Sequence, residues 1–213
     1  MIVAVPKEVL PGENRVAATP ASVKELIKSG LTVHVQSGAG SASFFPDDDY
    51  RSAGAEIVSD VKKLFSEADI VLKVAPPTQN PDLGIHEAEA MKKGAVYVSF
   101  IQTTRELETV KKFVANEITG FSMHLIPRTT LAQKMDALSS QANIGGYKAV
   151  LIGASHIAVY MPLLMTAAGT IPPAKVLVLG AGVAGLQAIA TAKRLGAQVE
   201  AFDVRPVVKE QVE

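Results

Sequence analysis

The chain has 213 residues, of which 48% are apolar, and its 21 Lys and Arg residues balance 21 Asp and Glu residues. This length suits one large or two small domains with a packed core. A formal net charge of zero, with no basic run, argues against nucleic-acid binding. The absence of cysteine excludes disulfides, Cys-ligated zinc and thiolate catalysis. The N-terminus lacks the apolar core of a secretory signal, which indicates a cytoplasmic location.

Strand and helix patterns alternate through the N-terminal half of the chain, as in an open α/β sheet. The predicted strands are Ile2–Val5, Leu31–Val35, Ala55–Val58, Ile70–Val74, Ala95–Phe100 and Ile118–His124. The predicted helices are Pro20–Ser29 with Thr19 as N-cap, Asp47–Ala53, Asp60–Ser66, His86–Lys92 and Arg105–Val114. Together they predict an N-terminal α/β domain over residues 1–130.

Charged residues follow two of these strands. Lys7, Glu13 and Arg15 lie in the loop after the first strand, and Lys73 lies near the end of the strand Ile70–Val74. Because ligands bind at the carboxyl ends of parallel strands, Arg15 and Lys73 are candidates to bind a carboxylate. The alternative is that they are ordinary solvated charges. No metal site is predicted, and four histidines without metal-ligand spacing are interpreted as structural: His34, His86, His124 and His156.

A polar stripe marks the segment Pro127–Tyr147, which joins the two predicted domains. Gln133, Asp136 and Ser139 recur every three residues and would share one face of a helix. Leu131, Met135 and Leu138 would occupy another face. Amide and carboxylate groups can match the donor and the acceptor of a nicotinamide carboxamide. The alternative is the solvated side of an amphipathic helix.

The stretch from Ala149 to Ile171 carries no formal charge if His156 is neutral. Its length would allow it to span a bilayer. It contains Pro162 and several polar residues, however, and leads directly into a nucleotide-binding pattern, so we interpret it as a long buried interdomain helix. Residues 131–174 are thus predicted to hold the linker segment and this helix.

The most informative segment is Lys175–Arg205, which has the pattern of a dinucleotide-binding βαβ unit. A buried strand, Val176–Leu179, stops at the G-x-G-x-x-G spacing of residues 180–185. Gly180 would permit the tight turn, Gly182 would leave room for a pyrophosphate, and Gly185 would let the helix pack closely on the strand. The pyrophosphate would lie at the helix N-terminus, beside Val183.

A second strand, Gln198–Phe202, places Asp203 about 20 residues after the glycines, where such units carry an acidic residue. A carboxylate there can accept hydrogen bonds from the ribose hydroxyls and repels a 2′-phosphate, which favours NAD(H) over NADP(H). Arg205 complicates this prediction, because a nearby Arg can accommodate a phosphate. Residues 175–213 are therefore predicted to begin a Rossmann domain that is truncated in this chain. The predicted fold is α/β, with two Rossmann-like doubly wound domains joined by a long helix.

With these residues in view, the sequence resembles the alanine dehydrogenase and pyridine-nucleotide transhydrogenase superfamily along its whole length. The matching segments are KEVLPGENRVAATP, the GAG at residues 38–40, DIVLKVAPP, the linker, and GAGVAGLQAIATAKRLGA followed by FDVRP. Alanine dehydrogenases carry a catalytic His where this chain has Gln102. The linker instead matches the transhydrogenase pattern, in which the corresponding Arg, Gln, Asp and Ser map onto Arg128, Gln133, Asp136 and Ser139.

The resemblance is strongest to the NAD(H)-binding alpha (alpha-1) component of proton-translocating transhydrogenases. It implies hydride transfer between NAD(H) on this component and NADP(H) on a partner domain. Arg128, Gln133, Asp136 and Ser139 would orient the nicotinamide. The implied partners are an NADP(H)-binding beta subunit and a membrane proton-channel component, with a homodimer on the inner face of the plasma membrane. Two alternatives remain open, an alanine-dehydrogenase-like oxidoreductase and a non-catalytic NAD-binding module.

Overall fold

The computed structural model describes residues 1–212, and the chain divides into two compact units, Met1–Thr129 and Thr130–Glu213. Each unit has its own sheet and its own apolar clusters. The sequence predicts three parts instead, residues 1–130, 131–174 and 175–213, and this finer division stays a prediction.

The first unit is built on a six-stranded parallel sheet with the order β3-β2-β1-β4-β7-β8. The strands are β1 (Ile2–Val5), β2 (Thr32–Gln36), β3 (Glu56–Val58), β4 (Ile70–Leu72), β7 (Val96–Ser99) and β8 (Thr119–Ser122). The chain fills one half of the sheet outward from β1 and then returns to fill the other half outward from β4. This doubly wound order confirms the predicted α/β fold class.

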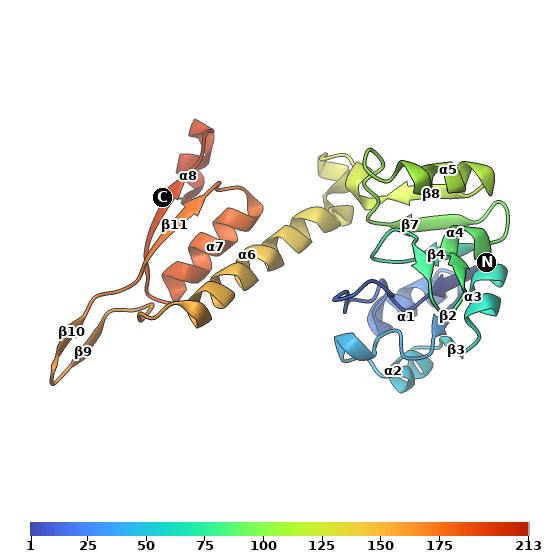
Figure 1. Cartoon of the computed structure of the whole chain (residues 1–213), viewed down its shortest axis with the longest axis horizontal. Coiled ribbons are helices and arrows are strands. Elements are labelled where there is room, and N and C mark those ends of the chain that lie inside the picture. The colour runs from blue at the N-terminus through green and yellow to red at the C-terminus, as the bar shows by residue number, and fades with distance from the viewer. Residues whose placement is uncertain (213) are drawn as a thin grey trace. The chain divides into compact units, whose positions relative to one another are not determined.

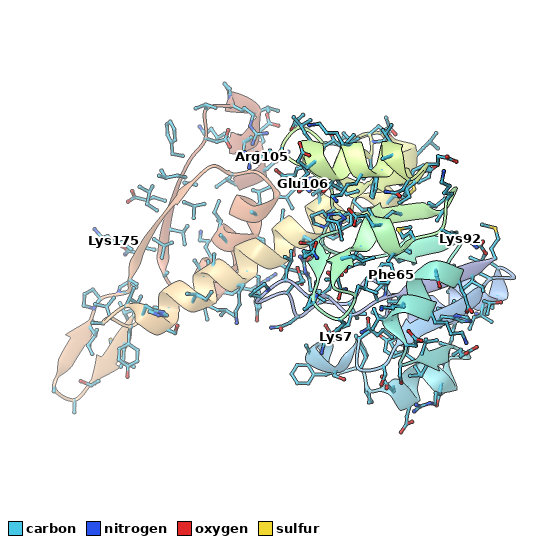
Figure 2. All side chains as sticks on the ribbon, turned by 45° about the vertical axis from the view of Figure 1, so that its right-hand side comes forward. Lys7, Phe65, Lys92, Arg105, Glu106 and Lys175 are labelled. Carbon is cyan, nitrogen blue, oxygen red and sulfur yellow. The ribbon has the colours of Figure 1, made fainter. Side chains whose placement is uncertain are left out.

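Helices cover both faces of this sheet (Figure 1). The helices are α1 (Pro20–Lys28), α2 (Asp47–Ser52), α3 (Val61–Glu67), α4 (Glu87–Ala90) and α5 (Leu107–Ala115). Val3 and Val5 pack with α1 and α2 in one apolar cluster, whereas Ala4 packs with α3, α4 and α5 in the other. This alternation follows from the pleat of the strand. Phe65 of α3, labelled in Figure 2, is fully buried in the second cluster.

Local sequence signals explain several boundaries in this unit. Thr19 caps α1 in a capping box with Ser22, as the sequence predicts for the N-cap, and Asp60 caps α3 through the amide of Lys63. A short antiparallel pair, β5 (Gln79–Asn80) and β6 (Ile85–His86), lies between β4 and α4. The 3-10 turns are η1 (Ser41–Ser43) and η2 (Met123–Leu125).

The second unit contains one parallel βαβ unit, an additional long helix and a hairpin. Its elements are η3 (Thr130–Met135), α6 (Ala137–His156), β9 (Leu164–Thr166), β10 (Gly169–Ile171), β11 (Lys175–Leu179), α7 (Val183–Arg194), β12 (Gln198–Phe202), η4 (Pro206–Val208) and α8 (Lys209–Val212). β11 and β12 pair in parallel, and β9 and β10 form an antiparallel ribbon that projects from the rest of the unit (Figure 1).

The prediction of one buried helix over Ala149–Ile171 is wrong. The helix begins at Ala137 and ends at His156, and only two of its residues, Gly146 and Val150, are buried. The side chains of Ser155 and His156 both hydrogen-bond to the carbonyl of Ile152, which competes with continuation of the helix. Pro162 then disfavours a helical conformation in the residue before it, and the rest of the stretch forms the hairpin. Over residues 1–212, no helix has the length and apolar character needed to cross a bilayer.

α6 packs on α7 through a very close backbone approach (Figure 1). A Cβ atom added to Gly146 would lie 2.0 Å from the carbonyl oxygen of Ala184 in α7. Any larger residue at position 146 would therefore push the two helices apart. Two other glycines of the same helix, Gly145 and Gly153, face open space.

We expect Gly146→Ala to destabilise the second unit by about 1–3 kcal/mol, because the methyl group would overlap the backbone carbonyl of Ala184 and the two helices would have to separate. Gly145→Ala and Gly153→Ala are matched controls, and each should instead stabilise α6 by about 0.5–1 kcal/mol through helix propensity. Hydrogen exchange of the α6 and α7 amides measures all three variants. Equal behaviour of Gly146→Ala and Gly145→Ala would show that the close approach is absent in solution.

Candidate functional site

The turn between β11 and α7 has the geometry of a phosphate-binding turn. Gly180 has φ of +94°, which favours glycine, and its amide donates to the carbonyl of Phe202 in β12 at 2.7 Å. A Cβ atom added to Gly185 would lie 1.8 Å from the carbonyl oxygen of Gly180. The helix therefore starts directly against the turn, as the sequence predicts for the third glycine of the motif.

Gly182 is the N-cap residue of α7 and leaves the helix N-terminus accessible. Within the described residues, no side chain caps this helix, so the amides of its first turn are available to an external acceptor. A Cβ atom added to Gly182 would come within 4 Å only of the Arg205 guanidinium, at 3.8 Å. The combination of open amides and the positive end of a helix dipole suits an anion such as a pyrophosphate. Val183 begins the helix and is exposed.

Asp203 follows β12 and reaches back to the same turn. Its Oδ2 accepts hydrogen bonds from the amide of Ala181 at 2.8 Å and from Nη2 of Arg205 at 3.0 Å. Its Oδ1 accepts from the backbone amide and Nε of Arg205, at 2.9 and 3.0 Å. Chiefly through the side-chain bonds from Arg205, these donors hold the pKa of Asp203 far below its usual range. The carboxylate therefore stays ionised at all ordinary pH values.

A cavity of about 480 Å³ opens beside this carboxylate. It is lined by Ala181, Ala201, Phe202, Asp203, Arg205, Pro206, Val208, Lys209 and Val212. The lining comes from the turn, the end of β12 and the C-terminal helical turns, so the cavity continues from the phosphate-binding turn past Asp203.

The polar residues of the linker do not lie on one helix, although the sequence pattern predicts that they do. Gln133 lies in η3, whereas Asp136 is the N-cap residue of α6, so the stripe is not one face of a continuous helix. Asp136 accepts hydrogen bonds from the amide of Ser139 at 2.9 Å and from its hydroxyl at 2.6 Å. Leu131 and Met135, which the pattern predicts on the other face, are 93% and 55% exposed.

The structure thus brings Asp136 and Ser139 into direct contact, both half-buried, while Gln133 is exposed. Arg128 is also exposed and belongs to the first unit, whereas the other three residues belong to the second. The contact between Asp136 and Ser139 could have been found from sequence as an Asp N-cap three residues before a serine.

The two candidate cations of the first unit are held by carboxylates. Arg15 pairs with Glu13 at 2.6 Å and lies over the ring of Phe100, with its guanidinium carbon 6.0 Å from the centroid. Lys73 has a fully buried side chain and donates to both oxygens of Glu87 at 2.8 and 2.9 Å. Lys73 is therefore not a solvated charge. Sequence reasoning missed Glu87, because its position carries no spacing signal that links it to Lys73.

The four histidines interpreted as structural, and Gln102, have the following surroundings. His34 is buried beside Glu56 at 3.4 Å, and His86 caps α4 through the amide of Ala88. His124 contacts the ring of Phe100, and His156 hydrogen-bonds within α6. Gln102, at the position of the alanine dehydrogenase histidine, is exposed in the loop after β7.

Comparison with known proteins agrees with this geometry. Residues 4–145 match the model for the alanine dehydrogenase/PNT N-terminal domain, and residues 149–213 match the model for its C-terminal domain. The chain therefore belongs to the alanine dehydrogenase/PNT family.

Individual relatives indicate the branch. The chain is 49% identical over its full length to an NAD(P) transhydrogenase alpha subunit of Rhodospirillum rubrum and covers 55% of that protein. It superimposes over its full length on a transhydrogenase crystal structure from Sinorhizobium meliloti, covering 61% of that chain with a TM-score of 0.92 and 46% identity. An L-alanine dehydrogenase structure has a TM-score of 0.85 at 28% identity, with 100% of this chain and 57% of that chain covered. The chain spans little more than half the length of these relatives and is more similar to the two transhydrogenases.

We expect Gly185→Ala to destabilise the second unit by about 3 kcal/mol, because the added methyl group overlaps the backbone of Gly180. Gly182→Ala is the control within the same turn and should cost no more than about 1 kcal/mol, the difference between Gly and Ala at an N-cap. Hydrogen exchange across α7 distinguishes the two variants. A stable Gly185→Ala protein with unchanged exchange would contradict the proposed close packing of helix on turn.

Proposed function

We propose that this chain belongs to the NAD(H)-binding component of a proton-translocating transhydrogenase and passes hydride between NAD(H) and NADP(H) held on a partner. The observation that carries the proposal is the turn at residues 180–185 with Asp203 bonded to it. The pyrophosphate would accept hydrogen bonds from the first-turn amides of α7, and the adenosine ribose would donate to Asp203.

The ionised state of Asp203 supports a preference for NAD(H). Its carboxylate repels a 2′-phosphate, and ribose hydroxyls would bond to it by replacing the two donors of the Arg205 side chain. The guanidinium of Arg205 donates two hydrogen bonds to this carboxylate, so the charge that could attract a 2′-phosphate is already paired within the protein. We still propose that Arg205 contacts the nucleotide, because its guanidinium lies beside Gly182.

Hydride transfer requires orientation more than acid–base chemistry. In our proposal Arg128, Gln133, Asp136 and Ser139 orient the nicotinamide, so that its C4 atom lies about 3–3.5 Å from the acceptor ring. The Asp136–Ser139 contact would fix one side of this arrangement before the nucleotide binds. The partners in the proposal are an NADP(H)-binding beta subunit and a membrane proton-channel component. The component would act as a homodimer on the inner face of the plasma membrane.

The direct test uses the chain extended to the length of its alpha-subunit relatives and mixed with an NADP(H)-binding component. We expect NADH-dependent reduction of an NADP⁺ analogue that neither component supports alone. Absence of turnover, with NADH still bound, would instead favour a non-catalytic binding module. Pyruvate- and ammonium-dependent oxidation of NADH by the isolated component would favour an amino-acid dehydrogenase.

Variants separate orientation from binding. Gln133→Ala, Asp136→Asn and Ser139→Ala should each lower the single-turnover rate at saturating NADH by about 100-fold, or about 2.7 kcal/mol, because a ring displaced by about 1 Å reacts slowly. Their NADH affinity should change little. Asp136→Asn keeps an N-cap side chain, so it tests the charge without removing the cap of α6.

The matched control is Ser140→Ala, which removes an exposed hydroxyl one position further along α6. It should leave the rate unchanged. Asp203→Asn should act in the opposite sense, weakening NADH binding by about tenfold while leaving the saturated rate near normal. Wild-type transfer rates in all three linker variants at saturation would remove these residues from the site.

A further inference from the structure

The centre of the first unit has the position of a ligand site but is filled by the protein itself. In the order β3-β2-β1-β4-β7-β8, the direction of chain winding reverses between β1 and β4. Doubly wound sheets bind ligands in the crevice at the carboxyl ends of these two strands. Glu8 follows β1 and Lys73 follows β4 directly, so both residues lie at that crevice.

Glu87 closes this crevice from α4. Its Oε1 accepts hydrogen bonds from Lys73 Nζ at 2.8 Å and from Asn80 Nδ2 at 3.0 Å. Its Oε2 accepts from Lys73 Nζ at 2.9 Å and from the amide of Thr78 at 3.2 Å. Lys73, Asn80 and Glu87 are all buried, with 3%, 1% and 0% of their surface exposed. One cation and two neutral donors therefore bind the Glu87 carboxylate, which is how a protein would bind an external carboxylate ligand.

Glu8 supplies a second carboxylate to the same ammonium group. Its Oε2 lies 3.5 Å from Lys73 Nζ, and its oxygens accept from the amides of Val74 and Ala75. Burial raises the pKa of Glu8, which Lys73 and the two amides partly oppose. An external carboxylate at Lys73 would meet Glu8 and Glu87 beside a single ammonium group, in buried surroundings where water screens charge poorly. Arg15, the other cation near Glu8, is paired with Glu13.

We propose that Glu87 is an internal carboxylate ligand and a specificity-determining residue, which occupies the position of a small monocarboxylate and so excludes 2-oxo and amino acids from the first unit. To bind there, an external carboxylate would have to expel Glu87 from four hydrogen bonds and leave it buried without donors. The proposal concerns the first unit alone and holds whichever redox partner the nucleotide has.

The test is chemical rescue. Glu87→Ala removes the carboxylate and leaves a cavity lined by Lys73, Asn80 and the amide of Thr78, which acetate can occupy. We expect acetate at about ten times its Kd to raise the Tm of Glu87→Ala by about 3–6 °C over equimolar chloride. Acetamide, which has the same shape without the charge, should have no such effect. If the variant is unfolded without ligand, the refolded yield in acetate against chloride is measured instead.

Three controls complete the design. The wild-type chain should show no acetate- or pyruvate-dependent shift in Tm. Glu87→Gln keeps the side-chain volume, so it should be destabilised without rescue. Glu117→Ala breaks an exposed ion pair with Lys93 and should respond equally to acetate and chloride. A wild-type chain stabilised by either acid, or a Glu87→Ala variant that responds equally to acetate, acetamide and chloride, would overturn the proposal. No nucleotide is present, so the result does not depend on hydride transfer.

Discussion

The close backbone packing around α7 is the constraint on which the geometry of the proposed nucleotide site depends. α7 meets the turn at Gly185 and meets α6 at Ala184, and in both places an added Cβ atom would lie 2.0 Å or less from a carbonyl oxygen. These two contacts lie one residue apart in the first turn of the helix. They fix the N-terminus from both sides, and the amides that would hold a pyrophosphate are directed by packing rather than by a capping side chain.

The two units use the carboxyl ends of parallel strands in opposite ways. In the second unit the helix amides beside Gly182 are left open, and the nearby Asp203 orders the turn. In the first unit the equivalent crevice contains Lys73 with two buried carboxylates, which meet its charge inside the protein. Because leaving a buried ammonium unpaired is costly, a crevice of this kind must hold either an internal or an external anion. Under the two proposals, the first unit fills its crevice with its own carboxylate and the second unit leaves its helix amides open for a nucleotide.

Local signals in the sequence predicted most elements and failed where the cause is not local. The unit β11-α7-β12 was predictable from its glycines and apolar runs, and the strands of the first unit from theirs. The stretch Ala149–Ile171 was wrongly predicted as one helix because an uncharged composition has no period that distinguishes a helix from a hairpin. Glu87 was missed because its partner Lys73 is 14 residues away and is brought to it by the β5–β6 excursion. The site residues of the linker remain predictions.

The hydrogen bonds of Asp203 link the ordering of the glycine turn to the proposed recognition of the ribose. One oxygen holds the amide of Ala181 within the glycine turn, and the same carboxylate is the group that would recognise the ribose. Arg205 donates to both oxygens and lies beside Gly182, so it connects the ribose end of the site with the phosphate end. A change that admits a 2′-phosphate by removing Asp203 would therefore also loosen the turn that holds the pyrophosphate. Under the proposed function, cofactor preference and phosphate binding cannot be altered independently in this chain, because one carboxylate supports both.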